Sequence, residues 1–280
     1  MHKILLSILL AAMLTAGCTS SKNDSFIAVT IEPQRFFAEK IAGKHFKILT
    51  VVPPGQDPET YDATPRQMLD FNRCTAYLLV GHLGFEQTWI KNILENNPDM
   101  KSFDLSEGFA LESGDAHDGH AGVDPHIWSS IDGARTMARN ILKAFVELDL
   151  EHEEEFKNNY EALMKEIDRT EAIIRDKLAS ATSKAFVMYH PALTYFAREF
   201  GLKQICFEIE GKNPTVRQSM IMTDLLFRAE ANVVFEQPEV DGKHLDFLAR
   251  SRSCRLVRIN LMSYNWSKEM IKVASALANE

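Results

Sequence analysis

The sequence predicts an α/β protein built from two doubly wound parallel-sheet lobes that are joined by one long rigid helix. Short apolar, β-branched runs alternate with helical stretches of about 10 to 15 residues, which is the pattern of parallel sheets. The alternation occurs twice, and a helical segment dense in Glu, Lys, Ala and Leu separates the two halves. The roughly 255 residues that follow the N-terminal segment suit two medium domains.

The first half of the chain alternates from residue 26 onwards. We expect strands over residues 26–31, 46–52, 76–80 and 102–105, and helices over residues 33–43, from 64 and over 86–96. Pro33 opens the first helix and Gly43 closes it, an asymmetry typical of helix ends. The N-terminal lobe is therefore assigned to residues 26–128. Within it, residues 107–123 are rich in Gly, Asp, Glu and His without periodicity, which predicts a mobile loop.

A linking helical segment is assigned to residues 129–182. Its stretch 153–177 would form a helix about 37 Å long, enough to cross from one lobe to the other; a helical hairpin inside one domain is the alternative. Beyond it the alternation resumes in a C-terminal lobe over residues 183–280. There we expect strands over 185–189, 204–209, 233–235 and 256–259, and helices over 192–200, 216–229, 243–250 and 268–278.

The first 17 residues have the layout of a secretory signal peptide, with a lysine, an apolar run over 4–14 and small residues before Cys18. The run is shorter than the roughly 20 residues of a spanning helix, which disfavours a permanent membrane helix. Cys18 directly after Ala16-Gly17 resembles the lipobox of bacterial lipoproteins. The resemblance implies an acylated Cys18, a tether over 18–25, and a lipid-anchored place in the cell envelope, on the periplasmic or outer-surface side.

Charge and cysteine spacing exclude two classes of function. The net charge is −8, and Lys and Arg are scattered without a basic stripe, so we expect no nucleic-acid partner. Cys74, Cys206 and Cys254 are spaced too widely for a zinc finger. A Cys206–Cys254 disulfide and two separate thiols both remain open.

Three histidines stand where strands are expected to end, the edge at which open parallel sheets bind ligands. They are His82, His126 and His190. Pro125 stiffens the turn that presents His126, which suits a metal ligand held at about 2.0–2.1 Å. The alternatives are a turn histidine without a metal for His126 and a bond to a loop carbonyl for His190. The same rule selects residues 53–61, 236–239 and Asn260.

Together these segments resemble the zinc- and manganese-type solute-binding lipoproteins of ABC importers, the ZnuA/TroA-like family. The resemblance rests on Pro54-Gly55-Gln56-Asp57-Pro58-Glu59-Thr60-Tyr61, Thr64-Pro65, Asp124-Pro125-His126-Ile127-Trp128, Tyr189-His190-Pro191 with Tyr195-Phe196-Ala197, and Gly201-Leu202. It implies two lobes with a metal in the cleft between them. The order of the motifs covers nearly the whole chain after the signal peptide.

The resemblance also implies four metal ligands, two from each lobe: Glu59, His126, His190 and Asn260. His126 and His190 match the family directly, whereas Glu59 stands where a histidine is usual and Asn260 where an aspartate is usual. A carboxylate can replace imidazole on zinc, so Glu59 completes a His₂Glu set. Asn260 offers a weaker amide oxygen or leaves a position to water. His82 either swings in as a replacement imidazole or merely caps the next helix.

Family members of the zinc type carry a histidine- and acid-rich loop, and His117 and His120 lie in such a segment here. We take it to favour zinc over manganese, because imidazole suits zinc; a solvated loop with incidental histidines is the alternative. His152, among the acidic residues 151–155, is interpreted as part of a solvated helix start.

These inferences predict a monomeric, non-enzymatic binding protein that captures zinc, or manganese, and delivers it to the permease of an ABC importer. Affinity should fall at low pH because the two histidines must be neutral to coordinate. An envelope adhesin that keeps the fold is one alternative. A zinc metalloenzyme is another, although the sequence has no HExxH helix.

Overall fold

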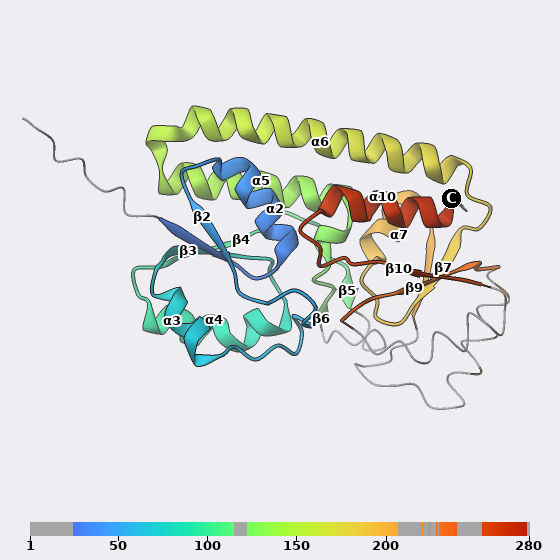
Figure 1. Cartoon of the computed structure of the whole chain (residues 1–280), viewed down its shortest axis with the longest axis horizontal. Coiled ribbons are helices and arrows are strands. Elements are labelled where there is room, and N and C mark those ends of the chain that lie inside the picture. The colour runs from blue at the N-terminus through green and yellow to red at the C-terminus, as the bar shows by residue number, and fades with distance from the viewer. Residues whose placement is uncertain are drawn as a thin grey trace, which may run out of the picture.

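A computed structural model describes residues 25–114, 122–206, 230–239 and 254–278, together with residues 220, 224 and 228. Two parallel sheets of four strands lie side by side, and a layer of helices covers one face of both (Figure 1). This confirms the α/β class and the strands expected in each half. Cys18, His117 and His120 lie outside the described residues, as do the helix expected over 243–250 and most of the one expected over 216–229.

The N-terminal sheet has the order β2-β1-β3-β4, and every neighbouring pair is parallel. Its elements are β1 (Phe26–Val29), α2 (Glu32–Ala42), β2 (Lys47–Thr50), α3 (Pro65–Phe71), β3 (Cys74–Leu79), α4 (Gly84–Asn96) and β4 (Lys101–Asp104). Side chains alternate along β1: Ile27 and Val29 pack under α2, and Ala28 faces the cluster beneath α3 and α4. Both faces of the sheet are therefore covered, as in other parallel sheets.

The C-terminal sheet repeats the plan in the order β10-β9-β7-β8, again with parallel neighbours. Its described elements are β7 (Ala185–Met188), α7 (Thr194–Phe200), β8 (Lys203–Cys206), β9 (Val233–Glu236), β10 (Arg255–Arg258) and α10 (Trp266–Leu277). Gly201 ends α7 in the left-handed conformation (φ 64°), which glycine adopts without strain. Because the central strand β7 starts this lobe, its carboxyl end lies in the middle of the sheet edge.

Two helices, α5 (Ile131–Leu148) and α6 (Glu153–Ala179), link the sheets. They pack against each other as a hairpin around a short 3₁₀ turn, Leu150–His152. Helix α6 also packs against α2 of the first half and α10 of the second, and it runs along both sheets (Figure 1). The expected crossing helix is thus present, and because α6 packs against elements of both halves, its hairpin with α5 is not the hairpin inside one domain that was the alternative.

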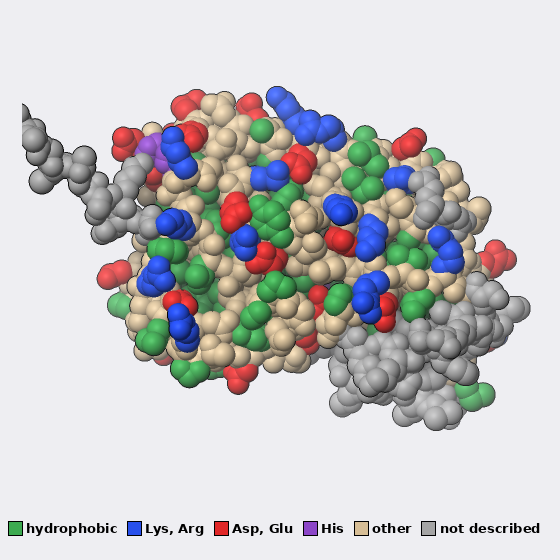
Figure 2. Space-filling view, in the orientation of Figure 1, with side chains coloured by type: hydrophobic (Ala, Val, Ile, Leu, Met, Phe, Trp, Pro, Cys, Tyr) green, Lys and Arg blue, Asp and Glu red, His purple; other side chains and the backbone are tan. Residues whose placement is uncertain are grey.

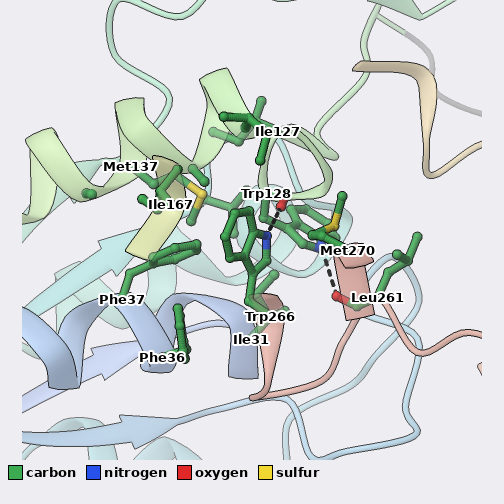
Figure 3. Close-up of a cluster of buried hydrophobic side chains, with 14 of the residues drawn as sticks. Ile31, Phe36, Phe37, Ile127, Trp128, Met137, Ile167, Leu261, Trp266 and Met270 are labelled. Carbon is green, nitrogen blue, oxygen red and sulfur yellow. Dashed lines mark hydrogen bonds between the residues drawn. The ribbon is translucent and has the colours of Figure 1, made fainter. Parts of the chain in front are cut away.

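A single buried core runs through both sheets, because the same helical layer covers them. At the junction Trp128 and Trp266 are both 2% exposed and are linked by hydrogen bonds: Trp128 Nε1 donates to Leu261 O (3.0 Å) and Trp266 Nε1 to Trp128 O (2.6 Å) (Figure 3). Phe36 and Phe37 of α2 pack beside Trp266. The segment after His126 is therefore fixed to the segment after Asn260.

Two further features concern the loop and the surface. The ends of the loop expected over 107–123 pair as a short antiparallel ladder, β5 (Ser113–Gly114) with β6 (Gly122–Val123). Acidic and basic side chains are interspersed on the face that Figure 2 shows. None of the helices in the described ranges is both long and apolar enough to cross a membrane.

Candidate metal centre

The predicted ligands lie at the carboxyl edges of the two sheets. In each sheet the chain reverses its direction of winding between two adjacent strands, β1 and β3 in the first and β7 and β9 in the second. Crevices form at such switch points and bind ligands. The loops after β2 and β3 carry Glu59 and His82, and the loop after β7 carries His190. His126 follows β6 and starts the turn into α5.

Glu59 is held at the edge of the first sheet by hydrogen bonds on both sides. Its backbone N–H donates to Asp57 Oδ1 (2.9 Å), and its Oε2 accepts the N–H of Gly84 (2.9 Å) at the start of α4. A Cβ on Gly84 would lie 2.3 Å from the carbonyl oxygen of Glu59, so this close approach needs glycine. The second oxygen, Oε1, is buried and has no hydrogen-bond partner among the described residues.

The charge on Glu59 depends on the histidines near it. Burial raises the pKa of Glu59, whereas His126, the N–H of Gly84 and His190 act to lower it. Both imidazoles therefore lie within electrostatic reach of this carboxyl group. An unpaired carboxylate oxygen within electrostatic reach of two imidazoles is a donor that a divalent cation can bind.

His126 is 3% exposed and is oriented by Asp124. Its Nδ1 lies 2.8 Å from Asp124 Oδ1, which also accepts the backbone N–H of His126 (2.9 Å). With the Nδ1–H donated to the carboxylate, Nε2 carries the lone pair that faces His190. A carboxylate behind a histidine in this way orients the ring and raises its basicity toward a metal.

Asp124 is itself fixed by the second half of the chain. Burial opposes its charge, but the interactions with His126 and the hydroxyl of Thr194 outweigh burial and lower the pKa of Asp124. The hydroxyl of Tyr195 donates to the backbone oxygen of Asp124 (2.6 Å). Both residues stand in the first turn of α7, so this helix holds the carboxylate that orients His126.

His190 meets His126 between the carboxyl edges of the two sheets, the place that we call the cleft. The two Nε2 atoms are 3.1 Å apart, so the Nε2–H of His190 donates to the lone pair of His126. Two imidazole nitrogens bound about 2.0–2.1 Å from a tetrahedral zinc are about 3.3 Å apart. A metal ion therefore fits between them once the ring proton of His190 is on Nδ1, which leaves the imidazole neutral with a lone pair on Nε2, and the rings separate by tenths of an ångström.

The structure gives less support to Asn260 and His82 as metal ligands than to His126 and His190. The Oδ1 of Asn260 accepts the N–H of Met262 (3.0 Å), so this oxygen already has one partner. His82 stands at φ 69° in the turn before α4, a left-handed conformation that is uncommon outside glycine.

Sequence reasoning assigned no role to Glu239, which follows β9 next to the end of β7. Its Oε1 is buried and has no hydrogen-bond partner among the described residues. Burial raises the pKa of Glu239, Asp57 raises it further, and His190 lowers it, so the carboxyl group lies within electrostatic reach of the cleft. The strand-end rule did select residues 236–239, but acidic residues are common in such turns and the rule does not single out Glu239. Only the strand order, which puts β9 next to β7, brings the loop of Glu239 near the loop of His190.

Comparison with known proteins gives consistent results. The family model for the periplasmic zinc-uptake complex component A, ZnuA, matches residues 27–273. The high-affinity zinc uptake system protein ZnuA of Bacillus subtilis is 26% identical over 71% of this chain and 66% of its own. The manganese-binding lipoprotein MntA of Halalkalibacterium halodurans is 25% identical over 84% of this chain and 80% of its own. A crystal structure of ZnuA superimposes with a TM-score of 0.86 at 29% identity, covering 91% of this chain and 98% of that one.

Proposed function

This chain belongs to the family of periplasmic zinc-uptake component A proteins, the metal-binding components of ABC importers, and we propose that it captures zinc in its cleft for delivery to a permease. The observation that carries the proposal is the approach of His126 and His190 from the two halves of the cleft, with Nε2 atoms 3.1 Å apart. Two imidazoles that approach from different segments of the chain can hold one ion between them. The family is one of binding components, so we assign no catalytic step.

We propose that Glu59, His126 and His190 coordinate the ion and that Glu239 or Asn260 completes the set. Glu239 is favoured because its Oε1 is buried without a hydrogen-bond partner in the described part of the chain, whereas Oδ1 of Asn260 accepts the N–H of Met262. Two carboxylates with two neutral imidazoles also cancel the charge of a divalent ion, which a buried site requires.

Zinc is the ion that this donor set favours. Imidazole suits zinc, whereas manganese prefers oxygen ligands, and at an unconstrained site zinc binds more tightly than manganese. Because two of the four donors are oxygen atoms, manganese should also bind, but with lower affinity than zinc. The cleft should therefore bind both ions and prefer zinc.

We further propose that the chain is attached to a membrane through an acylated Cys18 and works as a monomer in the cell envelope. The segment 18–25 supports the membrane attachment, because it is short and consists mostly of small and polar residues, as suits a tether. The division into lobes at residues 26–128 and 183–280, with 129–182 between them, belongs to the same proposal.

Calorimetric titration of the full chain with zinc and with manganese at neutral pH tests the function. We expect a tight zinc site that is lost in the double variant His126→Ala with His190→Ala, and a lower affinity of that site for manganese. His82→Asn is the matched control, because asparagine tolerates the left-handed backbone at that position. A full chain that binds neither ion tightly would contradict the proposal, and loss of binding in the control would make His82 a ligand.

A further inference from the structure

A second cluster of metal-binding side chains lies at the far end of the first half of the molecule. His45 stands in the turn between α2 and β2, and Asp149 and His152 stand in the turn between α5 and α6. One ligand atom from each lies within 4.8 Å of the other two. The α5–α6 turn is at the outer end of the molecule (Figure 1). The 18 residues of α5, about 27 Å of helix, lie between this turn and the turn that carries His126.

His45 is the unusual member of this cluster because it is buried. Its side chain is 3% exposed, and its Nδ1 has no hydrogen-bond partner among the described residues. Its Nε2 pairs with Glu155 Oε2 at 2.8 Å. Buried polar atoms are nearly always satisfied in folded proteins, so the unsatisfied Nδ1 of His45 requires an explanation.

His152 faces His45 and is oriented by a carboxylate. Its Nδ1 lies 2.7 Å from Asp149 Oδ2, the arrangement that Asp124 and His126 adopt in the cleft. The rings of His45 and His152 lie with centroids 3.9 Å apart and planes tilted by 33°. Two imidazoles and two carboxylates thus converge from two turns that are distant in the sequence.

The surrounding charge favours a cation. Helix α6 begins with Glu153, Glu154 and Glu155, and a histidine lies among charged side chains at this end of the face in Figure 2. Acidic residues in a first turn are explained by the helix dipole. The dipole does not explain a buried histidine stacked on a second histidine, so the cluster is more than the solvated helix start expected from the sequence.

We propose that His45, Asp149 and His152 form a second divalent-metal site, with Glu155 as a fourth ligand. Two imidazoles with carboxylates suit zinc. An ion bound there joins the α2–β2 turn to the α5–α6 turn and fastens α6 to the first sheet. The site is separate from the cleft and does not depend on the transport function.

The test is made in a full chain whose cleft and loop histidines are removed by His117→Ala, His120→Ala, His126→Ala and His190→Ala. We expect this background to bind one zinc ion and to melt at a higher temperature with zinc than with chelator. Adding His152→Asn should weaken zinc binding by at least about tenfold, because even loss of an outer-shell partner costs about 10 to 100-fold. Glu154→Gln is the matched control, since it removes a charge from an 85% exposed side chain on the same turn.

Two results would overturn the site: a background chain that binds no zinc, or equal zinc affinity with and without His152→Asn. Circular dichroism establishes that each variant is folded, and Asp149→Asn replaces His152→Asn if the latter is not. Because the cleft histidines are absent from every variant in this test, a negative result would overturn the second site without bearing on the proposed cleft site. Zinc anomalous scattering from the same background should give a peak beside His45.

Discussion

The two halves of the cleft are held in different ways. On the first side, Glu59 Oε2 accepts the N–H of Gly84, and His126 Nδ1 lies 2.8 Å from Asp124. On the second side, His190 and Glu239 stand on the loops after β7 and β9, and Oε1 of Glu239, like Oε1 of Glu59, is buried with no hydrogen-bond partner in the described part of the chain. The difference teaches that the first half is oriented by hydrogen bonds to Gly84 and Asp124, and we infer that the ion joins it to the second by binding the open oxygen of each carboxylate.

The largest effect should come from removing the oriented imidazole. We expect His126→Ala to lower zinc affinity by more than the roughly 10 to 100-fold that an outer-shell partner carries, because a direct ligand is lost and the carboxylate of Asp124 is left buried beside the site. Competition with a zinc-binding dye measures the loss, with His82→Asn as control. If His190→Ala reduced the affinity and His126→Ala did not, the second half would be the dominant one and the comparison would be reversed.

The next effect tests orientation without removing a ligand. Asp124→Asn should weaken zinc binding by about 10 to 100-fold, because the amide no longer fixes the tautomer and ring of His126. Asp132→Asn is the control, since that carboxylate is 69% exposed and close in the sequence. Equal affinities for the two variants, measured with the same dye, would show that orientation by Asp124 contributes nothing.

A smaller effect is expected on the second side. Glu239→Gln should lower zinc affinity by about tenfold, or about 1.4 kcal/mol, because the amide keeps one oxygen for the metal but loses the negative charge. Glu236→Gln is the control, since its carboxylate at the end of the same strand pairs with Arg258 (3.0 Å). An unchanged affinity for Glu239→Gln together with a loss for Asn260→Ala would return the fourth position to Asn260.

The smallest effect on zinc affinity is expected for Glu86, which should instead have a clear effect on stability. It is buried and accepts the N–H groups of Val80 (2.8 Å) and Gly81 (2.9 Å), which lie in the turn that leads to Gly84. Burial, the dominant cause, raises the pKa of Glu86 from 4.5 to about 7. The folded chain therefore holds a proton that the unfolded chain has lost between these pH values, so stability should fall as pH rises from 4.5 to 7, by about 3 kcal/mol.

Glu86→Gln should flatten that dependence, because a neutral side chain does not titrate. Urea unfolding of the metal-free chain at pH 4.5 and pH 7 checks it, with Glu154→Gln as an exposed control. A slope that is the same in Glu86→Gln and in the unsubstituted chain would mean that other groups produce the pH dependence.

The sequence predicted the strands well and selected two imidazoles, His126 and His190, that the structure brings together, for a physical reason. Apolar runs and helix-end signals at Pro33 and Gly43 are local, and so is the rule that ligands follow strand ends, which selected His126 and His190. What it missed depends on contacts between distant segments. Strand order brings Glu239 beside His190, and the packing of α6 against α2 brings His152 to His45.

The central claim is that one metal ion is held between the two halves of the cleft. A crystal structure of the zinc-loaded full chain, with anomalous scattering at the zinc edge, tests it most directly. We predict a peak about 2.0–2.1 Å from Nε2 of both His126 and His190, with a carboxylate oxygen of Glu59 and of Glu239 at about 2.0–2.2 Å. A cleft without a zinc peak, in which the two imidazoles remain hydrogen-bonded to each other, would contradict the account.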